Sequence, residues 1–161
     1  MLRVLMVEDS ADDAELTLDA LRDGGFGVDC LRVETAAAMQ SALAGGNWDV
    51  VLSDYSLPRF GAEEALSVLK ASRCDIPFIV VSGCIGEETA VALMKAGAHD
   101  FVMKDSPARL VPAIRRGMQE TQTRRQFNVA QTALQGNEER FRAIVSNLPG
   151  LVYQLMRQKD G

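Results

Sequence analysis

Five short apolar runs alternate with stretches of helical periodicity over the first hundred residues, and this alternation constrains the fold more than any other feature. The runs are 3–7, 28–33, 49–53, 77–82 and 100–104. Most are apolar at almost every position, as strands buried on both faces of a parallel sheet tend to be. Because strand–helix–strand crossovers are right-handed, the pattern predicts an α/β fold of the (βα)5 type, a five-stranded parallel sheet with helices on both faces.

Charged and hydroxyl side chains stand at the carboxyl ends of four of these runs. They are Glu8 and Asp9 after the first run, Asp54 after the third, and Ser82 and Lys104 at the ends of the last two. Ligands of open parallel sheets bind beyond the carboxyl ends of the strands. We therefore expect these five side chains to lie close together, although each alone could be an ordinary polar residue at a strand end.

Three carboxylates at one edge of a sheet repel one another unless a cation neutralises them. No histidine or cysteine accompanies Glu8, Asp9 and Asp54 in their motifs. A donor set made only of oxygens favours a hard cation, and Mg²⁺ fits this set best. The sequence therefore predicts a magnesium site at the carboxyl edge of the sheet.

Asp54 is the candidate nucleophile of this predicted site. A carboxylate can attack phosphorus and form a covalent aspartyl phosphate. Lys104 can pair with the phosphoryl oxygens as a compact point charge, and Ser82 can donate a hydrogen bond to one of them. Catalysis in such a site comes from positioning and charge neutralisation.

Four motifs resemble the receiver domain of bacterial two-component response regulators. They are VEDS (7–10), LSDYSLP (52–58), VVSG (80–83) and GAHDFVMKD (97–105). The resemblance covers residues 1–121 and implies a doubly wound, flavodoxin-like sheet. It also implies a phospho-acceptor that is supplied by the phosphohistidine of a histidine kinase or of a phosphotransfer protein, rather than an enzyme.

The resemblance assigns a role to each matching residue. Asp54 matches the acceptor, Lys104 the invariant lysine, and Ser82 with Phe101 the switch pair. Glu8 and Asp9 match the acidic pair, with Asp9 as a direct metal ligand, and the backbone carbonyl of Ser56 matches the third protein contact to Mg²⁺. By contrast, Asp12 and Asp13 are expected to cap the first helix and complement its dipole.

Two positions depart from the family pattern. Asp105 follows the lysine where the family usually has a proline, often after a cis peptide bond, and a cis bond before a residue other than proline costs about 3 kcal/mol. The sequence leaves open whether the Lys104–Asp105 bond is cis or trans. Gly61 also lies seven residues after the acceptor rather than eight, which is expected to alter the turn into the third helix.

The C-terminal third differs from the rest in charge. Residues 1–105 hold 8 Lys/Arg and 18 Asp/Glu, a net charge of −10, whereas residues 106–161 hold 9 and 4, a net charge of +5. Residues 113–146 contain no proline. Within them and just beyond, Phe127, Leu134, Phe141 and Leu148 fall seven apart, as in the seam of a parallel coiled-coil dimer. A helix that folds back onto its own domain is the alternative.

We therefore expect a receiver domain at 1–121, a linker helix with a partial coiled coil at 122–146, and at 147–161 the truncated start of a PAS-like domain. The longer protein would then be, for example, a hybrid histidine kinase or a cyclic-dinucleotide enzyme. The apolar runs are too short for a signal peptide or a membrane span, and the three scattered cysteines suggest reduced thiols, so a cytoplasmic location is expected.

Three other functions remain open on the sequence. A phosphatase of the haloacid dehalogenase type needs a second acid two residues after its nucleophile, and Ser56 occupies that position. A nucleic-acid-binding regulator could use the basic C-terminal helix through Arg115, Arg116, Arg124 and Arg125. A receiver that no longer uses phosphate is disfavoured, since all the reacting groups are present.

Overall fold

The computed structural model describes residues 1–84 and 86–146. The strands are β1 (Leu2–Val7), β2 (Val28–Val33), β3 (Val50–Asp54), β4 (Phe78–Ser82) and β5 (Asp100–Met103). The helices are α1 (Ala11–Asp23), α2 (Ala36–Gly45), α3 (Ala62–Ser72), α4 (Glu87–Lys95), the short 3₁₀ helix η1 (Pro107–Arg109) and α5 (Leu110–Ser146). Each observed strand lies within one residue of its predicted run at both ends.

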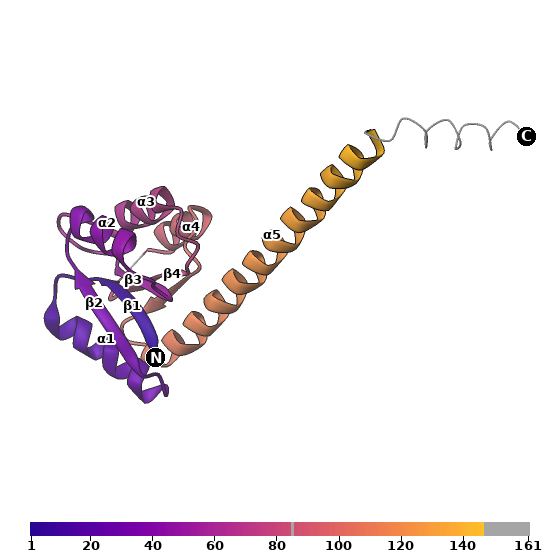
Figure 1. Cartoon of the computed structure of the whole chain (residues 1–161). Helices are drawn as coiled ribbons and strands as arrows, with labels where there is room; N and C mark the ends of the chain where they lie inside the picture. The colour runs from indigo at the N-terminus through magenta and orange to yellow at the C-terminus, as the bar shows by residue number, and fades with distance from the viewer. Residues whose placement is uncertain (85, 147–161) are drawn as a thin grey trace, which may run out of the picture. The chain divides into compact units, whose positions relative to one another are not determined.

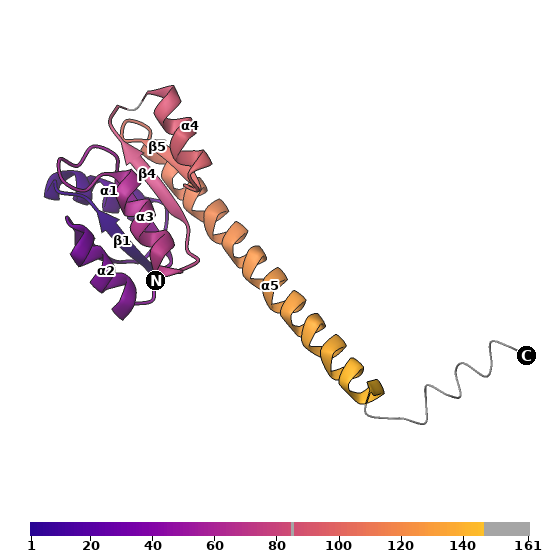
Figure 2. The same cartoon turned by 90° about the horizontal axis from the view of Figure 1, so that it is seen from above.

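The five strands form one parallel sheet in the order β2-β1-β3-β4-β5. Two apolar cores cover its two faces, because successive side chains of a strand point to opposite sides. Leu5, Val51 and Phe78 pack with residues of α2, α3 and α4 on one face. Val4 and Leu52 pack with residues of α1 and α5 on the other. Helix α1 lies on the opposite side of the sheet from α2, α3 and α4 (Figure 1 and Figure 2). The predicted doubly wound α/β fold is confirmed.

The chain divides into two compact units, residues 1–121 and residues 122–161. The first unit contains the whole sheet and the start of α5, whose buried residues are Leu110, Ala113, Ile114, Gly117 and Thr121. The second contains the rest of α5. The predicted start of a PAS-like domain, 147–161, lies outside the described residues. Among the helices that the structure describes, none is both long and apolar enough to cross a membrane.

Pro107 and Pro112 explain how the last helix begins. A proline fits the first turn of a helix, where its missing N–H has no partner to lose, but it disrupts a helix interior. Pro107 opens η1, and α5 then starts afresh at Leu110, which puts Pro112 in its first turn. The two prolines therefore account for the short turn and for the new start of the helix.

Gly117 lets α5 approach the beginning of β4. A Cβ atom at this position would lie 2.8 Å from the Cβ of Pro77, closer than side chains pack. We expect Gly117→Ala to lower the free energy of unfolding by about 1 kcal/mol, because the overlap with a rigid ring outweighs the better helix propensity of alanine. Gly136→Ala is the matched control, since nothing lies within 4 Å of a Cβ there. Urea unfolding would contradict this expectation if the first variant matched or exceeded the wild type in stability.

Candidate functional site

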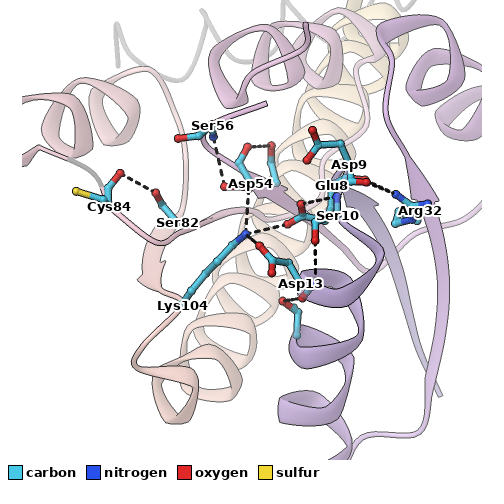
Figure 3. Close-up of polar contacts among 12 residues, drawn as sticks. Glu8, Asp9, Ser10, Asp13, Arg32, Asp54, Ser56, Ser82, Cys84 and Lys104 are labelled. Atoms are coloured by element: carbon cyan, nitrogen blue, oxygen red, sulfur yellow. Dashed lines mark hydrogen bonds and ion pairs between the residues drawn. The ribbon is translucent and has the colours of Figure 1, made fainter. Parts of the chain in front are cut away.

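Three of the five predicted side chains, Glu8, Asp54 and Lys104, are in contact at the carboxyl edge of the sheet (Figure 3). Glu8 follows β1, Asp54 is the last residue of β3, and Lys104 follows β5. The parallel register places these ends side by side, with Val7 opposite Ser53 and Ser82 opposite Met103. Acids separated from the lysine by 96 and 50 residues therefore contact one ammonium group.

The Lys104 ammonium donates hydrogen bonds to three carboxylates. Its Nζ lies 3.1 Å from Oε2 of Glu8, 3.0 Å from Oδ2 of Asp54 and 2.5 Å from Oδ2 of Asp13. Burial by itself would lower the pKa of Lys104, but the hydrogen bonds to Asp13, Asp54 and Glu8 outweigh it and raise the pKa above its ordinary value. The lysine is therefore held in its charged form, in the middle of the acidic group.

Glu8 is the most buried acid of the site, with 4% of the residue exposed. Burial raises the pKa of its carboxyl group, and the hydrogen bonds from the Ser10 N–H and from Lys104 oppose that shift. The Ser10 N–H donates to Oε1 of Glu8 over 3.0 Å. Ser10 also caps α1, since its hydroxyl accepts from the N–H of Asp13. One serine thus positions both the buried acid and the start of the helix.

Asp13 belongs to the site, which the sequence analysis did not anticipate. Oxygen atoms of Glu8, Asp13 and Asp54 all lie within 4.8 Å of one another. The expectation that Asp13 caps the first helix is wrong, because Ser10 is the cap. Asp13 does lie in the first turn, where an acid complements the helix dipole, and its carboxylate also contacts Lys104. The sequence does place Asp13 in the first turn of a helix that starts at the carboxyl edge of the sheet, and this position could have indicated a role in the site. Stabilisation of the helix start explains the same position from neighbouring residues alone.

Asp9 and Ser56 lie beside the acidic group in different ways. Asp9 is exposed and does not belong to the group of three mutually close carboxylates. Its backbone carbonyl accepts from Arg32, as does that of Glu8, so Arg32 braces the loop that carries both acids. The N–H of Ser56 donates to Oδ1 of Asp54 over 3.3 Å. Arg32 is a second residue of the site region that sequence reasoning missed.

The predicted switch residues lie on the two strands beyond the acceptor strand, and neither is hydrogen-bonded to Asp54 among the described contacts. The hydroxyl of Ser82, on β4, donates to the carbonyl of Cys84 over 3.1 Å (Figure 3). Phe101, on β5, is half-buried and packs against the core on the α2–α4 face of the sheet. Together with Val91 and Met94 of α4, it lines a shallow depression on that side.

The Lys104–Asp105 bond is trans, like every peptide bond among the described residues. Two backbone hydrogen bonds hold the loop after β5. The N–H of Lys104 donates to the carbonyl of Ser82, and the N–H of Ser106 donates to the carbonyl of Met103. Asp105 itself is exposed. The question that the sequence left open is thus resolved, and the lysine reaches the acids without a proline behind it.

The donor set fits a hard divalent cation. The three clustered ligand atoms are all carboxylate oxygens, and oxygen ligands are those that Mg²⁺ prefers. The three carboxylates surround the ammonium group of Lys104, so this group of acids already accommodates a positive charge. Glu8 and Asp54 are the side chains of this group that the sequence predicts as ligands, and Asp13 adds a third carboxylate beside them.

Known proteins match this chain over the part that carries the site. The family model of the response regulator receiver domain matches residues 4–115. The nitrogen assimilation regulatory protein NtrX of Azorhizobium caulinodans is 31% identical over 126 residues, which cover 76% of this chain and 27% of that protein. A protein-glutamate methylesterase/protein-glutamine glutaminase of Caulobacter vibrioides is 31% identical over 111 residues, which cover 68% of this chain and 32% of that protein. The chain thus spans about a third or less of these two relatives.

Solved structures show the same fold. NtrX from Brucella abortus superimposes with a TM-score of 0.70 at 25% identity, covering 81% of this chain and 30% of that one. The receiver domain of a LuxO repressor protein from Vibrio parahaemolyticus gives 0.68 at 24% identity, covering 78% of this chain and 96% of that one. Fold, motif positions and family model agree, and the chain belongs to the response regulator receiver domain family of two-component signalling.

Proposed function

We propose that this chain accepts a phosphoryl group on Asp54 in the presence of Mg²⁺, and that the donor is the phosphohistidine of a histidine kinase or a phosphotransfer protein. The observation that carries the proposal is the contact of one lysine ammonium with Asp54 and with the buried Glu8. That arrangement combines an acid at the end of a strand with a fixed positive charge for phosphoryl oxygens.

In the proposed reaction an oxygen of Asp54 attacks phosphorus while the bond from phosphorus to the donor's imidazole nitrogen breaks. The electron pair of that bond stays on the imidazole, and Asp54 becomes a mixed anhydride with phosphate. Bound Mg²⁺ would neutralise part of the negative charge that gathers as the two anionic groups meet. Glu8 and Asp54 would hold the ion, with Asp9 and the carbonyl of Ser56 as further candidate ligands.

The donor needs access to Asp54 and Lys104. A cavity of about 790 Å³ lies between α1 and the start of α5, and Asp13 and Lys104 form part of its wall. Leu16 of α1, which is 69% exposed, and Val111 of α5 contribute apolar surface to it. An apolar surface next to the reacting groups suits a protein donor, and we expect the donor to bind over this cavity.

The proposed response uses Ser82 and Phe101. In the phosphorylated protein the Ser82 hydroxyl would leave the Cys84 carbonyl and donate to a phosphoryl oxygen, and Phe101 would move inward. Such a change requires the phosphoryl group to interact differently with the two arrangements, which the exchange of hydrogen-bond partner at Ser82 provides. The altered face of β5 and α4 is then the surface that passes the signal on.

The mass of the protein tests the acceptor role directly. After incubation with acetyl phosphate and Mg²⁺, we expect the intact mass to increase by one phosphoryl group, and the increase to disappear when EDTA replaces Mg²⁺. A wild-type mass that stays unchanged with acetyl phosphate and also with a purified kinase would overturn the proposal.

We also propose that α5 pairs with the α5 of a second copy. Phe127, Leu134 and Phe141 are 67%, 62% and 68% exposed, and they recur every seven residues. A seam of this period buries its apolar residues in a parallel coiled coil. Through such a pair the receiver would act on segments that follow it, which we propose to begin with the PAS-like residues 147–161.

Oligomeric state tests the proposed pairing. We expect Leu134→Glu to convert a dimer into a monomer in light scattering at micromolar concentration, because it puts two like charges into the apolar seam. Gln135→Glu adds the same charge one residue away, outside the seam, and should leave the dimer intact. A wild type that is monomeric at every concentration would argue against the pairing.

No second function is favoured by a contact among the described residues. The methylesterase relative is matched over only a third of its length, and its activity is a property of that protein. We propose that this chain has no turnover of its own, since the position two residues after Asp54 is Ser56 rather than a second acid. The other prediction, nucleic-acid binding through the basic helix, has no supporting observation.

A further inference from the structure

The first turn of α1 supplies a carboxylate that the proposed reaction does not use. Of the three acids around Lys104, Asp13 lies closest, with its Oδ2 2.5 Å from Nζ. It is also the most exposed of the three, since 39% of its side chain is accessible, against 12% for Asp54 and 5% for Glu8. Lys104 is therefore shared between two acids of the strand ends and a third from a helix.

Hydrogen bonds fix the backbone around Asp13, and this holds its carboxylate toward Lys104. Its N–H donates to the capping hydroxyl of Ser10 over 3.2 Å, and its carbonyl accepts from the hydroxyl of Thr17 over 2.9 Å. Asp12, the preceding residue, is exposed and has no such role among the described contacts. The two adjacent acids thus have the same charge and sequence context but differ in whether they contact the lysine.

Phosphorylation of Asp54 would change how favourable the contact between Asp13 and Lys104 is. A phosphoryl group brings about two negative charges to a place where Asp54 had one. The carboxylate of Asp13 lies within 4.8 Å of the oxygens of Asp54 and Glu8, so it would face those added charges. At the same time Lys104 has to pair with the phosphoryl oxygens. The contact with Lys104 would favour the unphosphorylated arrangement, and repulsion between Asp13 and the phosphoryl group would disfavour the phosphorylated one.

We propose that Asp13 is a positioning residue which restrains Lys104 in the unphosphorylated protein and thereby slows phosphorylation of Asp54. The inference rests on the proposed acceptor function and adds regulation to the same site. Asp13 acts through the lysine and does not itself exchange atoms with the donor. Its carboxylate sets how readily Lys104 is released to pair with a phosphoryl group.

The rate of phosphorylation by acetyl phosphate at saturating Mg²⁺ tests the proposal. We expect Asp13→Asn to react about threefold to fivefold faster than the wild type, the factor expected for a partly exposed charge contact. The variant should also be half-saturated at a lower concentration of beryllofluoride. Asp12→Asn, with the same loss of charge, should match the wild type, and Asp13→Glu should restore a slow rate. A variant that reacts no faster, or that reacts more slowly because it binds Mg²⁺ less tightly, would overturn the proposal.

A measurement without any phosphoryl donor separates this inference from the acceptor function. Labelling with an amine-reactive acylating reagent, read by peptide mass mapping, reports how tightly Lys104 is held. We expect Lys104 to label faster in Asp13→Asn than in the wild type, while Lys70 and Lys95 label equally in both. If Lys104 behaves in this way but the wild type never takes up phosphate, the acceptor function fails and the contact stands. If the wild type is phosphorylated and Lys104 labels alike in both proteins, the inference fails alone.

Discussion

Asp54→Ala should lose the phosphoryl mass increase completely, although the other acids of the site remain. Asp54 accepts both from the Lys104 ammonium and from the N–H of Ser56, which fixes its carboxylate at the end of β3. Glu8 is buried and held by the Ser10 N–H and by Lys104, and Asp13 is held by Lys104, so we expect neither acid to replace it. Intact-mass measurement after incubation with acetyl phosphate and Mg²⁺ would show the loss.

Two further variants show whether the loss of phosphorylation is specific to the Asp54 carboxylate. Asp54→Asn keeps the shape of the side chain and should fail in the same way, because an amide is a poor nucleophile. Asp12→Asn removes an acid of the same edge and should be phosphorylated normally. Circular dichroism confirms that each variant is folded. If Asp54→Ala were still phosphorylated to the wild-type level, another residue would be the acceptor.

Lys104→Met should destabilise the protein by about 2–4 kcal/mol when no divalent cation is present, which is the largest stability change that we expect from a single site residue. The substitution leaves Glu8 and Asp54 without their ammonium partner at side-chain exposures of 5% and 12%. Urea unfolding in EDTA measures the loss. Lys95→Met is the control, because Lys95 is exposed on α4.

The same variant should respond strongly to magnesium and to pH. Because a bound ion replaces the missing charge, millimolar Mg²⁺ should stabilise Lys104→Met more than the wild type. Burial already raises the pKa of Glu8, and loss of the lysine would raise it further. A raised acid pKa in the folded state favours folding at low pH, so the deficit should be smaller at pH 5 than at pH 8. An equal deficit with and without Mg²⁺ would count against a cation site.

The fold could be predicted because its signals are local. An apolar run such as 77–82 needs both of its faces covered, which a central parallel strand between helical layers provides. The restart of the last helix at Leu110 was also readable from Pro112 alone. These features depend on residues that are neighbours in the sequence, where composition and spacing are sufficient.

The site was predictable only in part, because its contacts are distant in sequence. The strand ends could be named, since the edge of a parallel sheet collects them. The contact between Asp13 and Lys104 spans 91 residues and depends on how α1 is oriented after its cap. A local explanation, stabilisation of the helix start, accounted for Asp13 equally well. The hydrogen bond from the Ser82 hydroxyl to Cys84 and the one from Arg32 to Glu8 also depend on loop conformation. The spacing of residues in the sequence does not predict that conformation.

The positive charge that balances the acidic edge comes from Lys104, the residue that follows the last strand, β5. Glu8, Asp13 and Asp54 are all synthesised well before Lys104, and β5 is an edge strand that joins the sheet through β4 alone. Contacts between residues so far apart form late, because the intervening chain must be ordered first. A nascent chain emerging from the ribosome would thus carry its acids without their ammonium, and the proposed acceptor site would be complete only when β5 had docked. Under the proposed function, phosphorylation of Asp54 would therefore wait for completion of the domain.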